Sequence, residues 1–73
     1  MVTLYSKPSC VQCGAVQRRL ESKNIPYKKV DISEDAKAYE HVAKLGYLSV
    51  PVVEGSDGSH FQGYDPARID ALV

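Results

Sequence analysis

The two cysteines are the feature that most constrains this chain, because both lie in one tetrapeptide, Cys10-Val11-Gln12-Cys13. A bridge between them would close a loop of four residues. On the loop-entropy account such a bridge contributes only roughly 2 kcal/mol, and it joins no distant parts of the chain. The 73 residues must therefore be held together by an ordinary hydrophobic core, and the cysteine pair is better explained by chemistry than as a scaffold.

Length and composition narrow the class of protein. A chain of 73 residues has room for one domain, which we place over 1–73. Nine Lys plus Arg balance nine Asp plus Glu, which argues against a nucleic-acid binder, and a hydrophobic content of 44% argues against intrinsic disorder. The sequence has no apolar run long enough to span a membrane and no secretory signal pattern. We expect a cytoplasmic protein that binds neither nucleic acid nor membrane.

The hydrophobic periodicity predicts the element order β-α-β-α-β-β-α. The expected elements, in chain order, cover about 2–6, 11–23, 27–32, 34–45, 52–54, 59–62 and 67–72. The first β-α-β unit should pair in parallel through a right-handed crossover, and the last two strands should form an antiparallel hairpin. The fold class expected is α/β, with a mixed four-stranded sheet and helices on both of its faces.

Local signals support the expected helices and turns. Ser33 is expected to cap the middle helix, which should bury four residues and end at Gly46. The four are Ala38, Tyr39, Val42 and Leu45. Asp57-Gly58 favours a hairpin turn, and Asp65-Pro66 provides an N-cap and a first-turn proline for the last helix. Arg18, Arg19 and Lys23 are interpreted as a solvated face of the first helix.

The position of Cys10 predicts a reactive thiol. It lies where a strand ends and a helix begins, so unpaired N–H groups and the helix dipole favour an anion there. Thiols of Cys-x-x-Cys motifs at such sites have a pKa lowered to about 3.5–7.5, and Lys7 adds positive charge nearby. Cys13 lies one turn further on the inner face. We therefore predict that Cys10 attacks a partner's disulfide and that Cys13 resolves the mixed disulfide.

The alternative interpretation of the cysteine pair is half of a metal site. Within one chain the other ligands would be His41 and His60, but His41 lies 28 residues beyond Cys13 and the two histidines are 19 residues apart. These separations do not match zinc-finger spacing. Two chains could still present two cysteine pairs to a zinc ion or an iron–sulfur cluster. We assign neither histidine a role, and expect a monomer whose redox-active disulfide needs no cofactor.

Five segments, taken with their spacing, resemble the NrdH-type redoxins, which are small glutaredoxin-like electron donors. The segments are Lys7-Pro8-Ser9-Cys10-Val11-Gln12-Cys13, Val30-Asp31-Ile32, Leu45-Gly46-Tyr47, Val50-Pro51-Val52-Val53 and Phe61-Gln62-Gly63-Tyr64-Asp65-Pro66. The resemblance covers essentially the whole chain. It implies the thioredoxin fold and a dithiol–disulfide electron carrier. It further implies reduction by thioredoxin reductase and delivery of electrons to the large subunit of a class Ib ribonucleotide reductase.

The resemblance also implies roles for residues outside the cysteine pair. Pro51 matches the cis-proline that faces the dithiol in this fold, so the Val50 backbone can pair with an extended partner segment beside Cys10. Phe61 and Tyr64 stand where the family pattern has Trp and Phe. They form either a docking patch for the partner or packing for the last helix, and packing is the favoured role for Phe61.

Two features of the same region leave room for a different reductant. Gly63 serves either close approach of a partner or a bend of the backbone. Glutaredoxins that use glutathione usually carry Gly-Gly and an acidic pair here, with Thr-Val-Pro before the strand. This chain has Ser49-Val50-Pro51 and only Gly63 with Asp65. The alternative function is therefore a glutaredoxin reduced by a low-molecular-weight thiol, for which Cys10 alone suffices.

Overall fold

The computed structural model describes residues 1–72, and its elements follow the predicted order. The strands and helices within this range are β1 (Val2–Ser6), α1 (Val11–Ser22), β2 (Tyr27–Asp31), α2 (Ala36–Lys44), β3 (Val52–Glu54), β4 (His60–Gln62) and α3 (Pro66–Asp70). No observed boundary differs from the predicted one by more than two residues, which is the usual uncertainty of helix and strand ends.

The strands of the described range form a mixed four-stranded sheet in the order β2-β1-β3-β4, as predicted. β1 pairs in parallel with β2, with Leu4 opposite Lys29, and antiparallel with β3, with Leu4 opposite Val53. β3 and β4 form the predicted antiparallel hairpin. Because β1 is an inner strand, the cysteine loop that follows its carboxyl end lies near the middle of that end of the sheet.

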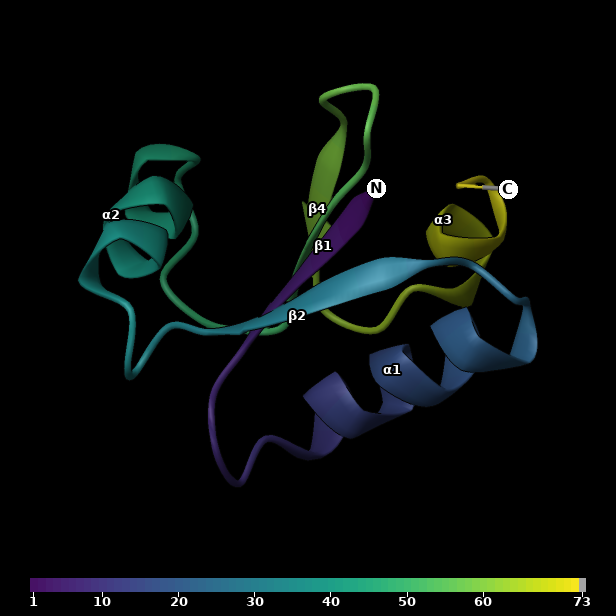
Figure 1. The fold of residues 1–73 in the computed structure, drawn as a ribbon, viewed down its shortest axis with the longest axis horizontal. Coiled ribbons are helices and arrows are strands. Elements are labelled where there is room, and N and C mark those ends of the chain that lie inside the picture. The colour runs from purple at the N-terminus through teal and green to yellow at the C-terminus, as the bar shows by residue number, and fades with distance from the viewer. Residues whose placement is uncertain (73) are drawn as a thin grey trace.

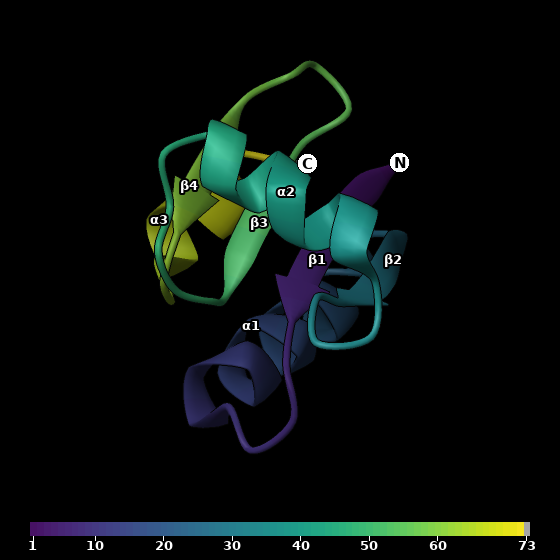
Figure 2. The same ribbon diagram turned by 90° about the vertical axis from the view of Figure 1, so that its left-hand side faces the viewer.

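Helices cover both faces of the sheet, as Figures 1 and 2 show. α1 and α3 lie on one face and α2 lies on the other. The larger core cluster lies between the sheet and α1 and α3, and consists of Val2, Leu4, Val16, Leu20, Ile25, Val53, Phe61 and Ile69. The smaller cluster lies under α2 and consists of Tyr5, Ala38, Val42 and Val52. Alternate residues of β1 and β3 thus serve opposite cores.

The start of α2 corrects one prediction. Ser33 does not cap this helix, because the Asp31 carboxylate accepts its N–H at 2.8 Å and its hydroxyl at 2.6 Å. This local turn delays the helix, and Asp35 is the N-cap instead, accepting the N–H of Ala38 at 3.1 Å. Short side chains that bond to backbone two residues away compete with helix in this manner.

The buried face of α2 is narrower than predicted. Ala38 and Val42 are buried, but Tyr39 is 60% exposed, so its assignment to the inner face was wrong. Leu45 follows the last helical residue as the C-cap and is half-buried. This helix of nine residues offers one i, i+4 pair to the core, and the neighbouring position points to solvent.

Two further observations complete the fold. An ion pair joins α1 to α3, because the Arg19 guanidinium donates to both carboxylate oxygens of Asp70, at 3.0 and 2.7 Å. The predicted solvated face of α1 therefore holds one helix–helix contact. None of the described helices is long and apolar enough to cross a membrane.

Candidate active site

The chain turns sharply between β1 and α1, and this turn presents Cys10 at the start of the helix. Ser9 has a φ of 64°, in the left-handed region, and Cys10 follows in an extended conformation as the N-cap of α1. The Sγ of Cys10 accepts the backbone N–H of Cys13 at 3.1 Å. The sulfur thus takes the place of the oxygen of an ordinary capping residue, where helix N–H groups favour a negative charge.

Cys10 and Cys13 form a disulfide, with their Cα atoms 5.2 Å apart. The two sulfurs differ in access, because Cys10 is partly exposed while Cys13 is only 4% exposed. Cys13 shares the inner face of α1 with the buried Val16 and Leu20. An incoming reagent therefore meets Cys10 first, which is the asymmetry that the sequence pattern predicted.

A groove of about 540 Å³ borders Cys10 on the side of β3 and β4. Its lining comes from three segments, and consists of Cys10, Val11, Gln12, Ser49, Val50, Gln62 and Gly63. The Val50–Pro51 peptide bond is cis, as expected for Pro51. The N–H of Gly63 donates to the carbonyl of Pro51 at 2.8 Å and joins two walls of the groove.

A second groove, of about 530 Å³, borders the cysteine pair on the side of β2. Both cysteines line it, together with Lys7 and Lys29. The structure thus places Lys7 beside Cys10, as expected, and adds Lys29, which the sequence did not single out. Two lysines along this groove make the approach electropositive, which favours thiolates and acidic partner segments.

The two aromatic residues after the hairpin lie in different places. Phe61 is 7% exposed and belongs to the core under α1 and α3, so the packing role favoured for it agrees with its position. Tyr64 is 43% exposed and lines a shallow depression with Arg18 and Arg19 of α1, outside the groove at Cys10. The two rings therefore do not form one patch beside the dithiol.

Gly63 has a φ of 86°, a conformation that residues with a side chain rarely adopt. A Cβ at this position would lie 3.8 Å from Oε1 of Gln12, across the groove beside Cys10. There is room for the added atom. The backbone bend, rather than close approach of another group within the chain, explains the glycine.

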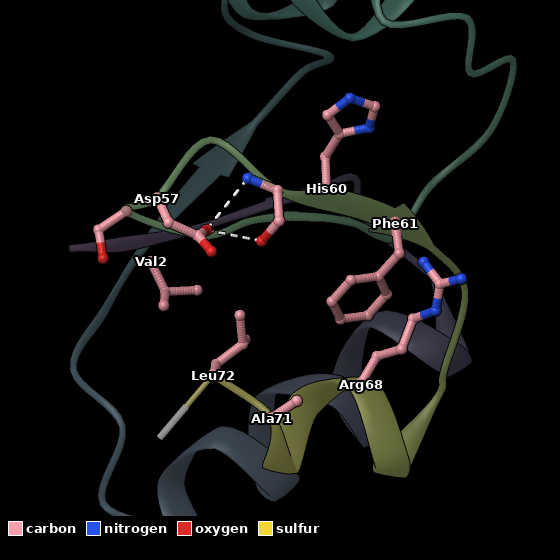
Figure 3. A pocket seen from close by; sticks show the side chains of 9 residues that line it. Val2, Asp57, His60, Phe61, Arg68, Ala71 and Leu72 are labelled. Atoms are coloured by element: carbon pink, nitrogen blue, oxygen red, sulfur yellow. Dashed lines mark hydrogen bonds between the residues drawn. The ribbon is translucent and has the colours of Figure 1, made fainter.

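A hollow of about 440 Å³ lies away from the cysteines, between the 55–59 turn, β4 and α3. Figure 3 shows Val2, Phe61 and Leu72 around its floor, with the Arg68 side chain at one end. The Arg68 guanidinium carbon lies 5.9 Å from the centre of the Phe61 ring. Figure 3 also shows the His60 imidazole on the opposite side of the strand, pointing away from Phe61.

Polar contacts that no sequence signal indicated lie on the α2 face. The carboxylate of Glu54 accepts a hydrogen bond from the Tyr5 hydroxyl at 3.2 Å and lies 3.0 Å from Nε2 of His41. Burial, and then the charge of Glu54, raises the pKa of Tyr5. The Tyr47 hydroxyl lies 2.6 Å from Nδ1 of His60. Both histidines thus act in structural contacts on this face, far along the chain from the cysteines.

Among the residues that the structure describes, no three or more His, Cys, Asp or Glu side chains form a group suited to hold a metal ion. Cys10 and Cys13 are joined to each other. His41 and His60 pair with different partners, Glu54 and Tyr47. These four residues are the ligands that a metal site within one chain would use. In the structure each of them makes a different contact.

Comparison with known proteins gives a consistent result. The family model for glutaredoxins matches residues 2–61. The glutaredoxin-like protein NrdH of Lactococcus lactis subsp. cremoris is 33% identical over 73 residues, which is 100% of both chains. The glutaredoxin-like protein NrdH of Escherichia coli K12 is 30% identical over 71 residues, covering 97% of this chain and 86% of the relative.

The solved structures agree with the sequence relatives. The structure of NrdH-redoxin from Escherichia coli matches with a TM-score of 0.92 and 28% identity, over 99% of this chain and 93% of that one. That protein is described as glutaredoxin-like with a thioredoxin-like activity profile.

Proposed function

Because this chain belongs to the glutaredoxin family, as an NrdH-type redoxin with the thioredoxin fold, we propose that it carries electrons from thioredoxin reductase to the large subunit of a class Ib ribonucleotide reductase. Its class of activity is thiol–disulfide oxidoreductase. The observation that carries the proposal is the Cys10–Cys13 disulfide, with Cys10 accessible at a helix start and Cys13 buried behind it. We place this activity in the cytoplasm, in a monomer with no cofactor besides the disulfide.

The first step joins the reduced protein to its acceptor. The Cys10 thiolate attacks one sulfur of the acceptor disulfide, a new S–S bond forms, and the acceptor's second sulfur leaves as a thiolate that takes up a proton. The N–H of Cys13, 3.1 Å from the Cys10 sulfur, stabilises the thiolate before attack. Lys7, on the wall of the neighbouring groove, adds positive charge.

The second step releases the acceptor. Cys13 loses its proton and attacks the Cys10 sulfur, the mixed disulfide breaks, and the acceptor's remaining sulfur leaves as a thiolate. Two electrons have then passed from the dithiol to the acceptor disulfide, and Cys10 and Cys13 are joined as in the structure. A dithiol of the reductase returns the two electrons by the same exchange in reverse.

An acceptor must lie along the groove beside Cys10 for the first step. The Val50 backbone borders this groove next to the cis peptide bond, where an extended segment of a protein can pair with it. This mode of binding favours a protein disulfide as acceptor. Gly63 lines the same groove, while Phe61 acts from the core and Tyr64 lies outside the groove.

The polar side chains that a low-molecular-weight thiol would need are already engaged within the chain. The Ser49 hydroxyl accepts a hydrogen bond from the Gln62 amide. The Asp65 carboxylate caps α3 by accepting the Arg68 N–H at 3.3 Å and also lies 3.6 Å from the Arg68 side chain. These contacts favour reduction by thioredoxin reductase over reduction by glutathione.

A coupled assay of NADPH oxidation tests the proposal. The purified protein and a disulfide substrate are combined with thioredoxin reductase in one arm, and with glutathione and its reductase in the other. We expect turnover in the first arm and its loss in Cys13→Ser, after which ribonucleotide reductase replaces the model substrate. Turnover in the glutathione arm alone, retained by Cys13→Ser, would overturn the proposed reductant.

A further inference from the structure

A side-chain contact forms part of the wall of the groove beside Cys10. Gln62, the last residue of β4, donates from Nε2 to the Ser49 carbonyl oxygen at 3.3 Å and to the Ser49 hydroxyl. Both residues line the groove. The contact joins the end of β4 to the loop that precedes the cis peptide bond, across 13 positions of the chain.

A second contact holds the same loop on the other side of Val50. Two residues further along the loop, the carbonyl of Pro51 accepts the Gly63 N–H at 2.8 Å. Val50 lies between the two attachments. Within residues 1–72, the backbone N–H and carbonyl of Val50 take part in no backbone hydrogen bond. The loop is therefore fixed on both sides of Val50, whose backbone is free to pair with another chain.

We propose that Gln62 is a positioning residue that selects protein disulfides over small disulfides. By holding Ser49, it keeps the Val50 backbone extended along the groove, ready to pair with a protein segment that carries the attacked cysteine. A small disulfide needs only contact with the Cys10 sulfur, so its reaction does not depend on the conformation of the Val50 backbone. The inference rests on the proposed attack by Cys10, but not on which reductase supplies the electrons.

The position of Gln62 makes the proposal testable, because the side chain is exposed and belongs to neither core cluster. Gln62→Ala removes the contact without opening a cavity. Ser59→Ala is the control, since the exposed Ser59 hydroxyl donates to Asp57 in a turn that lines neither groove at the cysteines. Ser49→Ala removes the hydroxyl from the other end of the contact.

The experiment uses prereduced protein in single-turnover mixing with insulin as the protein disulfide and hydroxyethyl disulfide as the small one. We expect Gln62→Ala to lower the second-order rate constant for insulin about three- to tenfold, the range of one or two modest hydrogen bonds. The rate constant for hydroxyethyl disulfide should stay within about twofold of wild type, because that substrate makes no backbone pairing. Ser59→Ala should leave both unchanged.

A double-mutant cycle shows whether Ser49 carries the effect. Ser49→Ala should slow the insulin reaction in the wild type and have little further effect in Gln62→Ala, because the contact is then already lost. Equal insulin rates for wild type and Gln62→Ala, equal losses for both substrates, or additive effects in the cycle would each overturn the inference. If wild-type protein reduces neither disulfide, the proposed attack by Cys10 fails, and the inference fails with it.

Discussion

The two faces of the sheet are built in different ways. The face under α1 and α3 is sealed by eight buried apolar side chains from six segments of the chain. The face under α2 has four buried residues, one of them Tyr5, and is bordered by polar contacts. The helix that bears Cys10 and Cys13 packs on the sealed face.

The polar contacts of the α2 face form a small network at its margin. Glu54 pairs with Tyr5 and His41, and Tyr47 pairs with His60. Each such hydrogen bond contributes only about 0.5–1.5 kcal/mol net, less than burying a large apolar side chain. The stability of the fold and the geometry of the cysteine pair therefore depend mainly on the face under α1 and α3, while α2 is held more weakly.

The largest effect is expected from the sealed face. Leu20→Ala removes a fully buried side chain of α1 and should lower the free energy of unfolding by about 2–5 kcal/mol. In a domain this small that is a large share of the total. Urea unfolding followed by circular dichroism measures it. A loss below about 1 kcal/mol would mean that α1 is not the anchor of the fold.

A smaller effect is expected from the opposite face. Val42→Ala removes two buried methyl groups under α2 and should cost about 1–2.5 kcal/mol. The rate of disulfide reduction by the folded variant should stay within about twofold of wild type, because α2 does not line either groove at the cysteines. Urea unfolding measures the loss of stability, and the single-turnover assay measures the rate of disulfide reduction. A destabilisation equal to that of Leu20→Ala would remove the contrast between the faces.

The polar margin of the α2 face should show itself at high pH. The pKa of Tyr5 is raised in the folded state, so the folded state holds this proton more tightly than the unfolded chain does. Its contribution to stability is complete below the ordinary tyrosine pKa of about 10, and is lost as the pH rises through the folded value. Tyr5→Phe should therefore reduce the loss of stability above about pH 10.

Stability curves between neutral pH and about pH 11 test this for wild type and Tyr5→Phe. Tyr39→Phe is the matched control, because Tyr39 lies on the same face but is exposed. Curves for wild type and Tyr5→Phe that stay parallel throughout would count against the link between Tyr5 ionisation and the α2 face.

The smallest effect is expected at the contact between α1 and α3, and at low pH. The hydrogen bonds from Arg19 lower the pKa of Asp70, so its contribution is present above the ordinary aspartate pKa and is lost as the pH falls through the folded value. Asp70→Asn should flatten the acid side of the stability curve. Because both side chains are about one-third exposed, added salt should shrink the difference.

Thermal melts between about pH 2 and pH 7, at low and high salt, measure this acid effect. Glu40→Gln serves as the control, since the ion pairs of the described residues do not include Glu40. An acid slope that is identical in wild type and Asp70→Asn would show that the ion pair has no part in it.

Much of the site followed from local sequence signals. Strand, turn and helix patterns placed Cys10 at a helix start and Cys13 on its inner face, since both depend on neighbouring residues alone. The cis peptide bond at Pro51 followed from the resemblance to a family, because most X-Pro bonds are trans and no local signal distinguishes this one. The error at the start of α2 arose because Ser33 donates both its N–H and its hydroxyl to Asp31, which competes with helix formation.

The sequence by itself determined the element order, the sheet with its covered faces, and the spacing and unequal exposure of the cysteine pair. These features depend on periodicity and on contacts between near neighbours. Only the tertiary structure decided that Arg19 reaches Asp70, that Glu54 joins Tyr5 to His41, and that Gln62 holds Ser49 beside Cys10. Each pair joins residues at least 13 positions apart, and polar side chains carry no periodic signal that identifies their partners.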